Sequence, residues 1–370
     1  MVYPVLIDYN YYYAEMPFLY KLILNAIIYP RKTYSMRLSL IGLIILLAAA
    51  SLMAQASFDQ LPVRDATRRF IKSLTPDQKT ICIRPLTDTN RTKWSNLPLE
   101  QVNRDGLRLD QLQDSQRVLI HDVLRTILSE QGYQKALFIM QYDEDTHTRL
   151  TAAKVPIAHR YGQEKYWTWI FGNPEDNNIW GFKFEGHHLS INMTFSPKGV
   201  SCTPHFTGIN PGLITKGMNA GKYILYHESE VGKNLFVSLS ETQRKKAHID
   251  TLPFTIDVRT QNGKEPFLTD HSGLPYIEMN TKQKVMVAQI INAWVDNFHP
   301  HIAGPHKKRM NTYLNKMRFV WMGTSSIHDL HYYGLLGPEW VIEFATRDQG
   351  IQHFHTLWRT MPDDFGITLY

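Results

Sequence analysis

Apolar residues recur at helical spacing in two long segments of the chain. In residues 107–131 the apolar side chains repeat every three or four positions, which places them on one face of a helix that we expect to end at Gly132. The same spacing recurs in residues 281–298 and predicts a second amphipathic helix. Shorter helices are predicted over residues 134–141, 241–248 and 307–317.

Other segments carry the aromatic and β-branched residues that are typical of strands. Residues 165–171 and 179–196 are separated by a turn-like stretch, and residues 200–206 follow a second turn. Four more strands are predicted near the C-terminus, at residues 318–322, 331–335, 339–345 and 352–358. Helices and strands come in runs without strict alternation, and we detect no internal repeat. The pattern therefore predicts an α+β fold, a single large domain with helices packed on a largely antiparallel sheet.

A candidate export signal lies near the N-terminus. From Met36 the chain reads MRLSLIGLIILLAAASLMAQA, in which Arg37 precedes an apolar stretch and Ala54-Gln55-Ala56 forms a small-x-small cleavage site. This is the layout of a secretory signal peptide, and its apolar core is shorter than the roughly 20 residues that span a bilayer. We therefore expect residues 36–56 to be cleaved, leaving a secreted or periplasmic domain over residues 57–370 with no stable membrane span. A retained N-terminal anchor is the alternative.

Residues 1–35 precede this signal. They are rich in Tyr and Ile and show no period that would give an element a buried face. Because an export signal acts at the N-terminus, we interpret Met36 as the true start and residues 1–35 as an over-extended, non-native segment.

The composition is that of a globular protein and argues against a nucleic-acid-binding function. Hydrophobic residues make up 43% of the chain and charged residues 20%, as in an ordinary globular protein. The net charge of +6 is mild and spread along the chain, which argues against a nucleic-acid partner. Cys82 and Cys202 are the only cysteines, and they either form one disulfide or stay buried as thiols. These features leave the oligomeric state open.

Histidines gather in two short motifs. In the segment Glu185-Gly186-His187-His188, strand alternation places Glu185 and His187 on one face and His188 on the other, and a bulge at Gly186 would bring the two imidazoles together. In the second motif, His353 and His355 share one face of a predicted strand. Imidazole and carboxylate are the usual ligands of zinc, copper and iron. The motifs predict either a metal site or a hydrogen-bonded polar cluster.

Further residues are weaker candidates. His205, which we expect on the face of Glu185 and His187, and His328 and His331 could complete a ligand shell, although a structural role or an exposed position is the favoured interpretation for each. Arg359 follows the second motif and suits either an anionic substrate or an ion pair, because its charge persists at working pH.

Four segments carry a family resemblance. They are Phe171-Gly172-Asn173-Pro174, Trp180-Gly181-Phe182-x-x-Glu185-Gly186-His187-His188-Leu189-x-x-Asn192, Gly337-Pro338-x-x-x-Ile342-Glu343 and His353-x-His355-Thr356-x-x-Arg359, followed by Asp364-Phe365-Gly366. In this order they resemble the uncharacterised family called domain of unknown function 3500, over nearly all of residues 60–370. Members of that family are often exported, which agrees with the signal. The resemblance groups the motifs and implies no particular reaction. The chain has Gly334 and Thr360 where the family pattern usually carries Arg and Asp.

Two functions are consistent with these features. The first is an exported metal-dependent enzyme, an oxidoreductase or a hydrolase, that acts on a small-molecule substrate. In this hypothesis His187, His188, His353 and His355 bind a divalent transition metal, copper, iron or zinc, and Glu185 is a further ligand or a general base. Redox chemistry is slightly favoured, since a shell of four imidazoles suits copper and iron as well as zinc. The second is a non-catalytic exported protein that binds a small ligand or a metal.

Overall fold

The computed structural model describes residues 61–369 except residues 177, 215–219, 251–256, 261–271, 325–329, 349–350 and 362. Residues Phe58–Tyr370 form one compact unit. The predicted signal over residues 36–56 and the segment before it lie outside the described residues. The mature start at Ser57 therefore stays a prediction.

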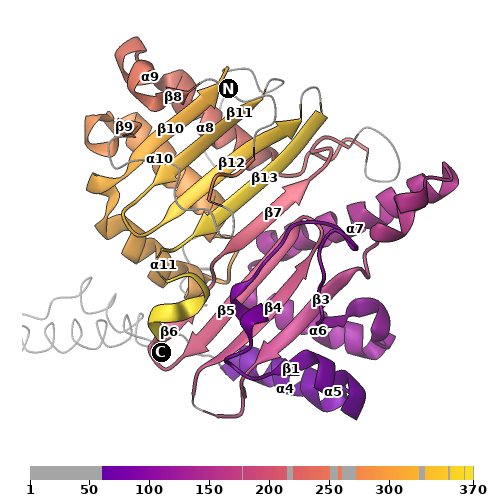
Figure 1. Cartoon of the computed structure of the whole chain (residues 1–370). Coiled ribbons are helices and arrows are strands. Elements are labelled where there is room, and N and C mark those ends of the chain that lie inside the picture. Colours follow the sequence, from indigo (N-terminus) through magenta and orange to yellow (C-terminus); the bar gives the residue numbers. More distant parts are fainter. Residues whose placement is uncertain are drawn as a thin grey trace, which may run out of the picture. The chain divides into compact units, whose positions relative to one another are not determined.

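A 13-stranded sheet forms the centre of the described unit (Figure 1). From edge to edge its order is β1 (Ile83–Arg84), β3 (Tyr166–Phe171), β4 (Trp180–Gly186), β5 (Leu189–Ser196), β7 (His205–Ile209), β13 (Ile351–Arg359), β12 (Val341–Asp348), β11 (His331–Leu336), β10 (Arg318–Gly323) and β8 (His248–Asp250). Short strands β2 (Leu107–Arg108), β6 (Gly199–Ser201) and β9 (Leu274–Pro275) pair with β3, β5 and β10. Only the edge pairs β1–β3 and β8–β10 are parallel. The predicted α+β class with a largely antiparallel sheet is confirmed.

The order of elements repeats within the chain. Each half has two helices, a short edge strand, a two-residue strand, two more helices and then the long strands, so the sheet order is the same from either edge. The helices are α4 (Leu61–Ser73), α5 (Pro76–Cys82), α6 (Asp114–Ile127) and α7 (Glu130–Ala152) in the first half, and α8 (Tyr226–Ser238), α9 (Glu241–Ala247), α10 (Thr281–Val295) and α11 (Pro300–Thr312) in the second. Figure 1 shows β7 of the first half beside β13 of the second. The described unit therefore consists of two copies of one structural repeat, and the sequence pattern did not reveal this repeat.

Matching glutamine pairs support this repeat. Gln78 donates through Nε2 to Oε1 of Gln116 at 3.1 Å, and Gln243 donates to Gln283 in the same way at 3.1 Å. The two acceptor glutamines also donate to the carbonyl of the last residue in the first helix of their half. Gln116 donates to Ser73, and Gln283 donates to Ser238. Because side-chain amides must be paired when buried, these bonds fix the first helix against the third in each half.

The prediction that a helix ends at Gly132 is wrong. Helix α6 ends at Ile127, and Gly132 lies inside the first turn of α7, where its N–H donates to the Ser129 hydroxyl at 3.1 Å. A Cβ on Gly132 would lie 1.9 Å from the Asn297 carbonyl oxygen. Gly132 is therefore present because the backbone at Asn297 lies so close, and it is not a helix stop.

The two faces of the sheet are covered differently. Helices of both halves pack on one face and share a core with the strands, which includes Phe184 and Phe354. The other face is covered by irregular segments, with Leu86 and Leu99 against Trp167 at one side and Val258 against the strands of the second half at the other. Since side chains alternate along a strand, each long strand has one face toward the helices and one toward these segments.

Two features bear on the environment of the chain. Cys82 and Cys202 are both buried free thiols, so the unpaired alternative holds, and burial raises the pKa of Cys82 to about 12. Within the part of the chain that the structure describes, no helix has the length and apolar character needed to cross a membrane.

The close approach at Gly132 gives a stability prediction. Replacing Gly132 with Ala forces a methyl group against the Asn297 carbonyl, so we expect the free energy of unfolding to fall by about 1–3 kcal/mol. Gln134→Ala is the matched control, because Gln134 lies exposed on the same helix, and it should change stability by less than about 0.5 kcal/mol. Urea denaturation of the three proteins measures both values, and equal stability of Gly132→Ala and the parent would contradict this packing.

Candidate metal centre

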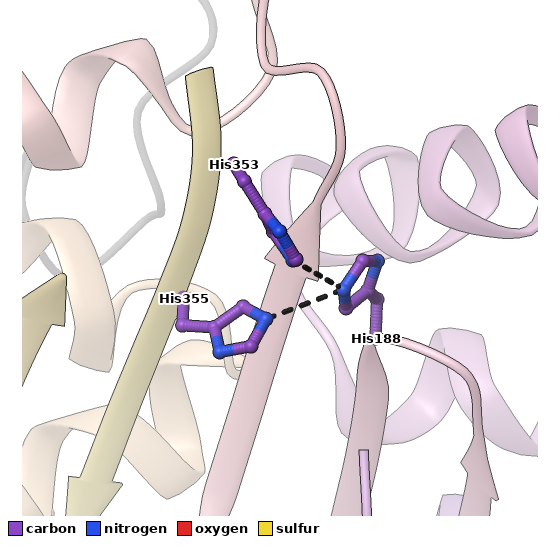
Figure 2. Close-up of side chains that lie close together, drawn as sticks. All are labelled: His188, His353 and His355. Carbon is purple, nitrogen blue, oxygen red and sulfur yellow. Dashed lines mark hydrogen bonds between the residues drawn. The ribbon is translucent and has the colours of Figure 1, made fainter. Parts of the chain in front are cut away.

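Three histidine side chains meet at the junction of the two halves (Figure 2). Nε2 of His188 lies 3.0 Å from Nε2 of His353 and 3.3 Å from Nε2 of His355. All three side chains are buried, with exposed fractions of 7% or less. We call these three residues the histidine trio. Two of them come from β13 and one from the β4–β5 connection.

The β4–β5 connection is a tight turn. Gly186 pairs with Leu189, so His187 and His188 form the tip of a hairpin, whereas the sequence pattern placed them on a continuous strand with a bulge. His188 has a φ of +59°, in the left-handed region that is uncommon for a residue with a Cβ. Its N–H donates to the Asn96 carbonyl at 3.1 Å, and its carbonyl accepts from the Gly208 N–H at 2.7 Å. Two other segments therefore hold His188 in this conformation.

Strand β13 supplies the other two imidazoles from one face, as predicted. His355 pairs with Gly208 across the β7–β13 contact. A Cβ on Gly208 would lie 2.8 Å from Cδ2 of His188 and 3.0 Å from Cδ2 of His355. The missing side chain at Gly208 thus provides the space in which the two rings meet.

Carboxylate hydrogen bonding orients one ring of the trio. Nδ1 of His355 lies 2.7 Å from Oδ1 of Asp257. Burial raises the pKa of Asp257, but the His355 ring and Arg347 outweigh burial and lower it to about 2. An ionised carboxylate accepts a hydrogen bond from the Nδ1–H group, which leaves the lone pair on Nε2 directed at the other two imidazoles.

The protonation of His188 is also constrained. Burial, followed by the neighbouring imidazoles, lowers the pKa of His188 well below its ordinary value. His188 is therefore neutral near pH 7, and its Nε2 atom lies within hydrogen-bonding distance of two further ring nitrogens. Converging nitrogen lone pairs favour a shared cation, and three imidazoles are an established ligand set for zinc, with copper also suited to imidazole. The trio fits a divalent transition metal.

His187 lies beside the trio. Its ring stacks on that of His188 with centroids 3.8 Å apart, and its Nδ1 lies 2.7 Å from Oδ1 of Asp143. The other carboxylate oxygen of Asp143 accepts from the Tyr166 hydroxyl at 3.0 Å. The nitrogens that meet in the trio do not include those of His187, so the structure brings together three of the four predicted ligands.

A cavity of about 550 Å³ opens beside the trio. Its wall combines residues of α7, the hairpin tip, β12 and β13 with Tyr161 and with segments 96–101 and 210–211. The lining residues are Asn96, Leu97, Pro98, Gln101, Tyr142, Asp143, Thr146, Arg149, Tyr161, His187, His188, Asn210, Pro211, Arg347 and His353. The size is that of a small-molecule site. A ligand in this cavity would contact His188 and His353 directly.

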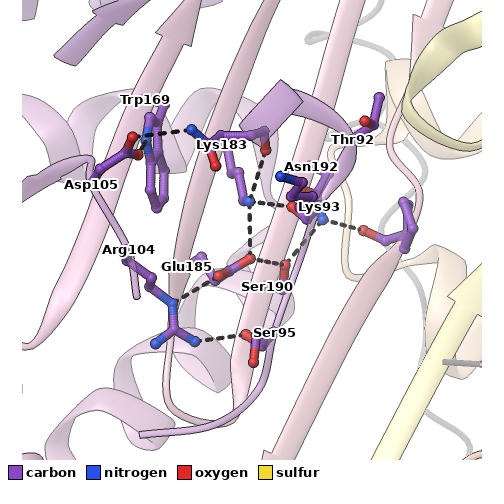
Figure 3. A network of polar contacts seen from close by, with 12 residues as sticks. Thr92, Lys93, Ser95, Arg104, Asp105, Trp169, Lys183, Glu185, Ser190 and Asn192 are labelled. Atoms are coloured by element: carbon purple, nitrogen blue, oxygen red, sulfur yellow. Dashed lines mark hydrogen bonds and ion pairs between the residues drawn. The ribbon is translucent and has the colours of Figure 1, made fainter. Parts of the chain in front are cut away.

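Glu185 lies in a separate network on the sheet (Figure 3). It is 2% exposed and pairs with Arg104 at 2.7 Å and Lys183 at 3.2 Å. Arg104 in turn donates to the carbonyls of Ser95 and Leu97, at 2.8 and 2.9 Å. These two residues flank Asn96, whose carbonyl holds His188. Glu185 is absent from the cavity wall and supports the segment that positions His188.

Arg359 also lies away from the trio. Its Nε donates to Asp364 at 2.6 Å, and its Nη1 donates to the Thr260 carbonyl at 2.6 Å. Glu343 accepts from the N–H groups of Arg259 and Thr260 at 2.6 and 3.1 Å. These contacts fix the backbone that follows Asp257 in sequence.

The weaker histidine candidates lie elsewhere. His205 faces the helices and not the face of Glu185, because its ring packs on Phe298 with centroids 4.8 Å apart. Burial, and then the charge of Lys135, lowers the pKa of His205 to about 3. His331 stacks on Trp321 at 5.2 Å, and His328 is outside the described residues.

Sequence reasoning missed Asp257, Asp143 and Gly208. Asp257 lies in an irregular segment, and Asp143 is on α7, far in sequence from the imidazole that it contacts. The only hint in the sequence is that both residues are carboxylates, since a buried imidazole needs a carboxylate or carbonyl partner. Gly208 lies two residues beyond the strand predicted at residues 200–206, so the sequence pattern gave no signal for its role.

Comparison with known proteins gives one match. The family described as "Protein of unknown function (DUF3500)" matches residues 58–367. No curated protein matches the chain, and no solved structure does. The match covers both histidine motifs and the whole of the described sheet, so the chain belongs to the DUF3500 family.

Proposed function

We propose that this protein is a metal-dependent enzyme whose divalent transition metal, copper, iron or zinc, is bound by His188, His353 and His355. The observation that carries the proposal is the convergence of three Nε2 atoms at the wall of a cavity of about 550 Å³. Three protein ligands leave further coordination positions for a substrate, as in catalytic metal sites. A purely structural site is usually closed by a fourth protein ligand.

The metal would act as a Lewis acid toward a substrate oxygen, and copper or iron would add electron transfer. The chain's own residues contribute orientation and charge. Asp257 holds the tautomer of His355, and the neutral state of His188 keeps its Nε2 available near pH 7. The Asp143–His187 pair faces the same cavity and places a second imidazole near a bound substrate.

Metal content tests this proposal directly. We expect about one equivalent of metal per chain in protein that starts at Ser57, and loss of that metal in His353→Ala/His355→Ala, because one imidazole cannot hold the ion alone. Elemental analysis after gentle purification measures the content. His299→Ala/His301→Ala is the matched control, since this pair has the same spacing at the start of α11 and its rings stack on each other outside the trio. Equal metal content in both double variants would rule out the trio as the site.

A second prediction separates support from ligation at Glu185. Glu185→Gln leaves the charge of buried Arg104 unpaired, so we expect the free energy of unfolding to fall by about 3 kcal/mol while the metal stays bound. Glu228→Gln is the control, because Glu228 is also buried and pairs with Lys135. Denaturation and elemental analysis on the same samples distinguish the roles. A folded Glu185→Gln protein without metal would contradict the prediction that metal binding does not depend on Glu185.

We propose that the protein is exported, because residues 36–56 have the layout of a signal peptide. Export would also allow the trio to acquire its metal outside the cytosol. N-terminal sequencing of the protein from the exported fraction of its natural cell should begin at Ser57. Recovery of peptides from residues 1–35 in that fraction would contradict this processing.

A further inference from the structure

We propose that the cavity beside the trio binds a small organic oxyanion, a carboxylate or a phosphate ester, through Arg149 and Arg347. The inference rests on the proposed function, since it names the substrate class of the same site. It is carried by the charges and donors of the cavity wall and by the position of Arg347 relative to the trio.

The charge of the wall favours an anion. Two arginines line the cavity, and Asp143 is the only acidic residue among its lining residues. Asp143 is 3% exposed, and its two carboxylate oxygens already contact His187 at 2.7 Å and Tyr166 at 3.0 Å. Asp143 therefore does little to offset the arginines toward a ligand, and a bound divalent metal would add to the positive potential.

Arg347 lines the cavity together with His188 and His353 of the trio. It is on β12, next to the strand that carries His353 and His355, and its side chain is 39% exposed. Its Nη1 is 3.9 Å from Oδ2 of Asp257, which is an ion pair but too long for a hydrogen bond. A ligand oxygen can thus form a direct hydrogen bond with this guanidinium.

Arg149 approaches from another wall. It lies in the last turn of α7 and is exposed, and its Nη2 donates to the Thr146 hydroxyl at a long 3.4 Å. Its side chain also contacts that of Tyr142 in the same wall. The planar guanidinium matches the oxygens of carboxylate and phosphate in a bidentate way. Two arginines from different elements can therefore fix both the charge and the orientation of one ligand.

The rest of the wall suits an organic group. Neutral donors come from three side-chain amides, and apolar contact surface comes from rings and aliphatic groups. The amides are Asn96, Gln101 and Asn210, and the apolar surfaces are those of Leu97, Pro98, Tyr142, Tyr161 and Pro211. An inorganic ion would leave these apolar surfaces without a partner, whereas a ligand with a carbon skeleton covers them.

Matched probes test the inference. Isothermal titration calorimetry compares benzoate, phenyl phosphate and the neutral benzamide on zinc-loaded and on metal-free protein that starts at Ser57. We expect at least one anion to bind about tenfold or more tightly than benzamide, and Arg149→Gln/Arg347→Gln to reduce that preference to less than about twofold. The two anions distinguish a carboxylate from a phosphate ester as the preferred group.

The control is Arg125→Gln, because Arg125 is 54% exposed on α6 and does not line the cavity. It should retain the full anion preference. Benzamide binding as tight as that of both anions, no binding of either anion, or an unchanged preference in the double arginine variant would each overturn the inference.

The two proposals can fail separately. Elemental analysis of the double arginine variant should show the same metal content as the parent, since neither arginine is a ligand. Anion preference in metal-free protein, together with no metal uptake by the parent, would refute the metal enzyme and retain the anion site. Normal metal content with no anion preference would refute the anion site and retain the metal centre.

Discussion

The antiparallel contact between β7 and β13 is the constraint on which the site depends. It joins the two halves of the sheet and places Gly208 opposite His355. The N–H of Gly208 also holds the carbonyl of His188, so one glycine contacts the ligands of both halves. Because the register of a strand pair fixes which side chains share a face, a shift of one residue would separate the three imidazoles.

The two halves differ at the turn that carries His188 in the first half. In the first half, His187 and His188 stand between Gly186 and Leu189. In the second half, the matching turn runs from Gly337 to Trp340, where the Gly337 N–H donates to the Trp340 carbonyl at 2.8 Å. Glu339 in that turn pairs with Arg309 at 2.9 Å. One copy of the repeat thus presents imidazoles, and the other uses the same hairpin for an ion pair.

Much of the fold could be predicted because its signals are local. The apolar period of α10 and the aromatic residues of β13 are local signals, and the alternation of β13 correctly placed His353 and His355 on one face. The turn at His188 was missed because its left-handed conformation depends on Asn96 and Gly208, which are distant in sequence. The repeat was missed because the two halves have little continuous sequence in common. Equivalent hydrogen bonds recur in both halves at only a few positions, such as Gln78 and Gln243. Asp257, the hydrogen-bond partner of His355, lies in an irregular segment, so no periodic pattern in the sequence could predict its position.

The separation of the ligands along the chain has a thermodynamic consequence. His188 and His353 are 165 residues apart. An ion held by both would close a loop of that length, and closing a long loop removes more conformational freedom from the unfolded chain than closing a short one. It would also bind the folded state alone, which shifts the folding equilibrium by mass action. The centre would then be a reversible cross-link between the two halves, so the metal supply of the compartment would set the persistence of the fold as well as its chemistry.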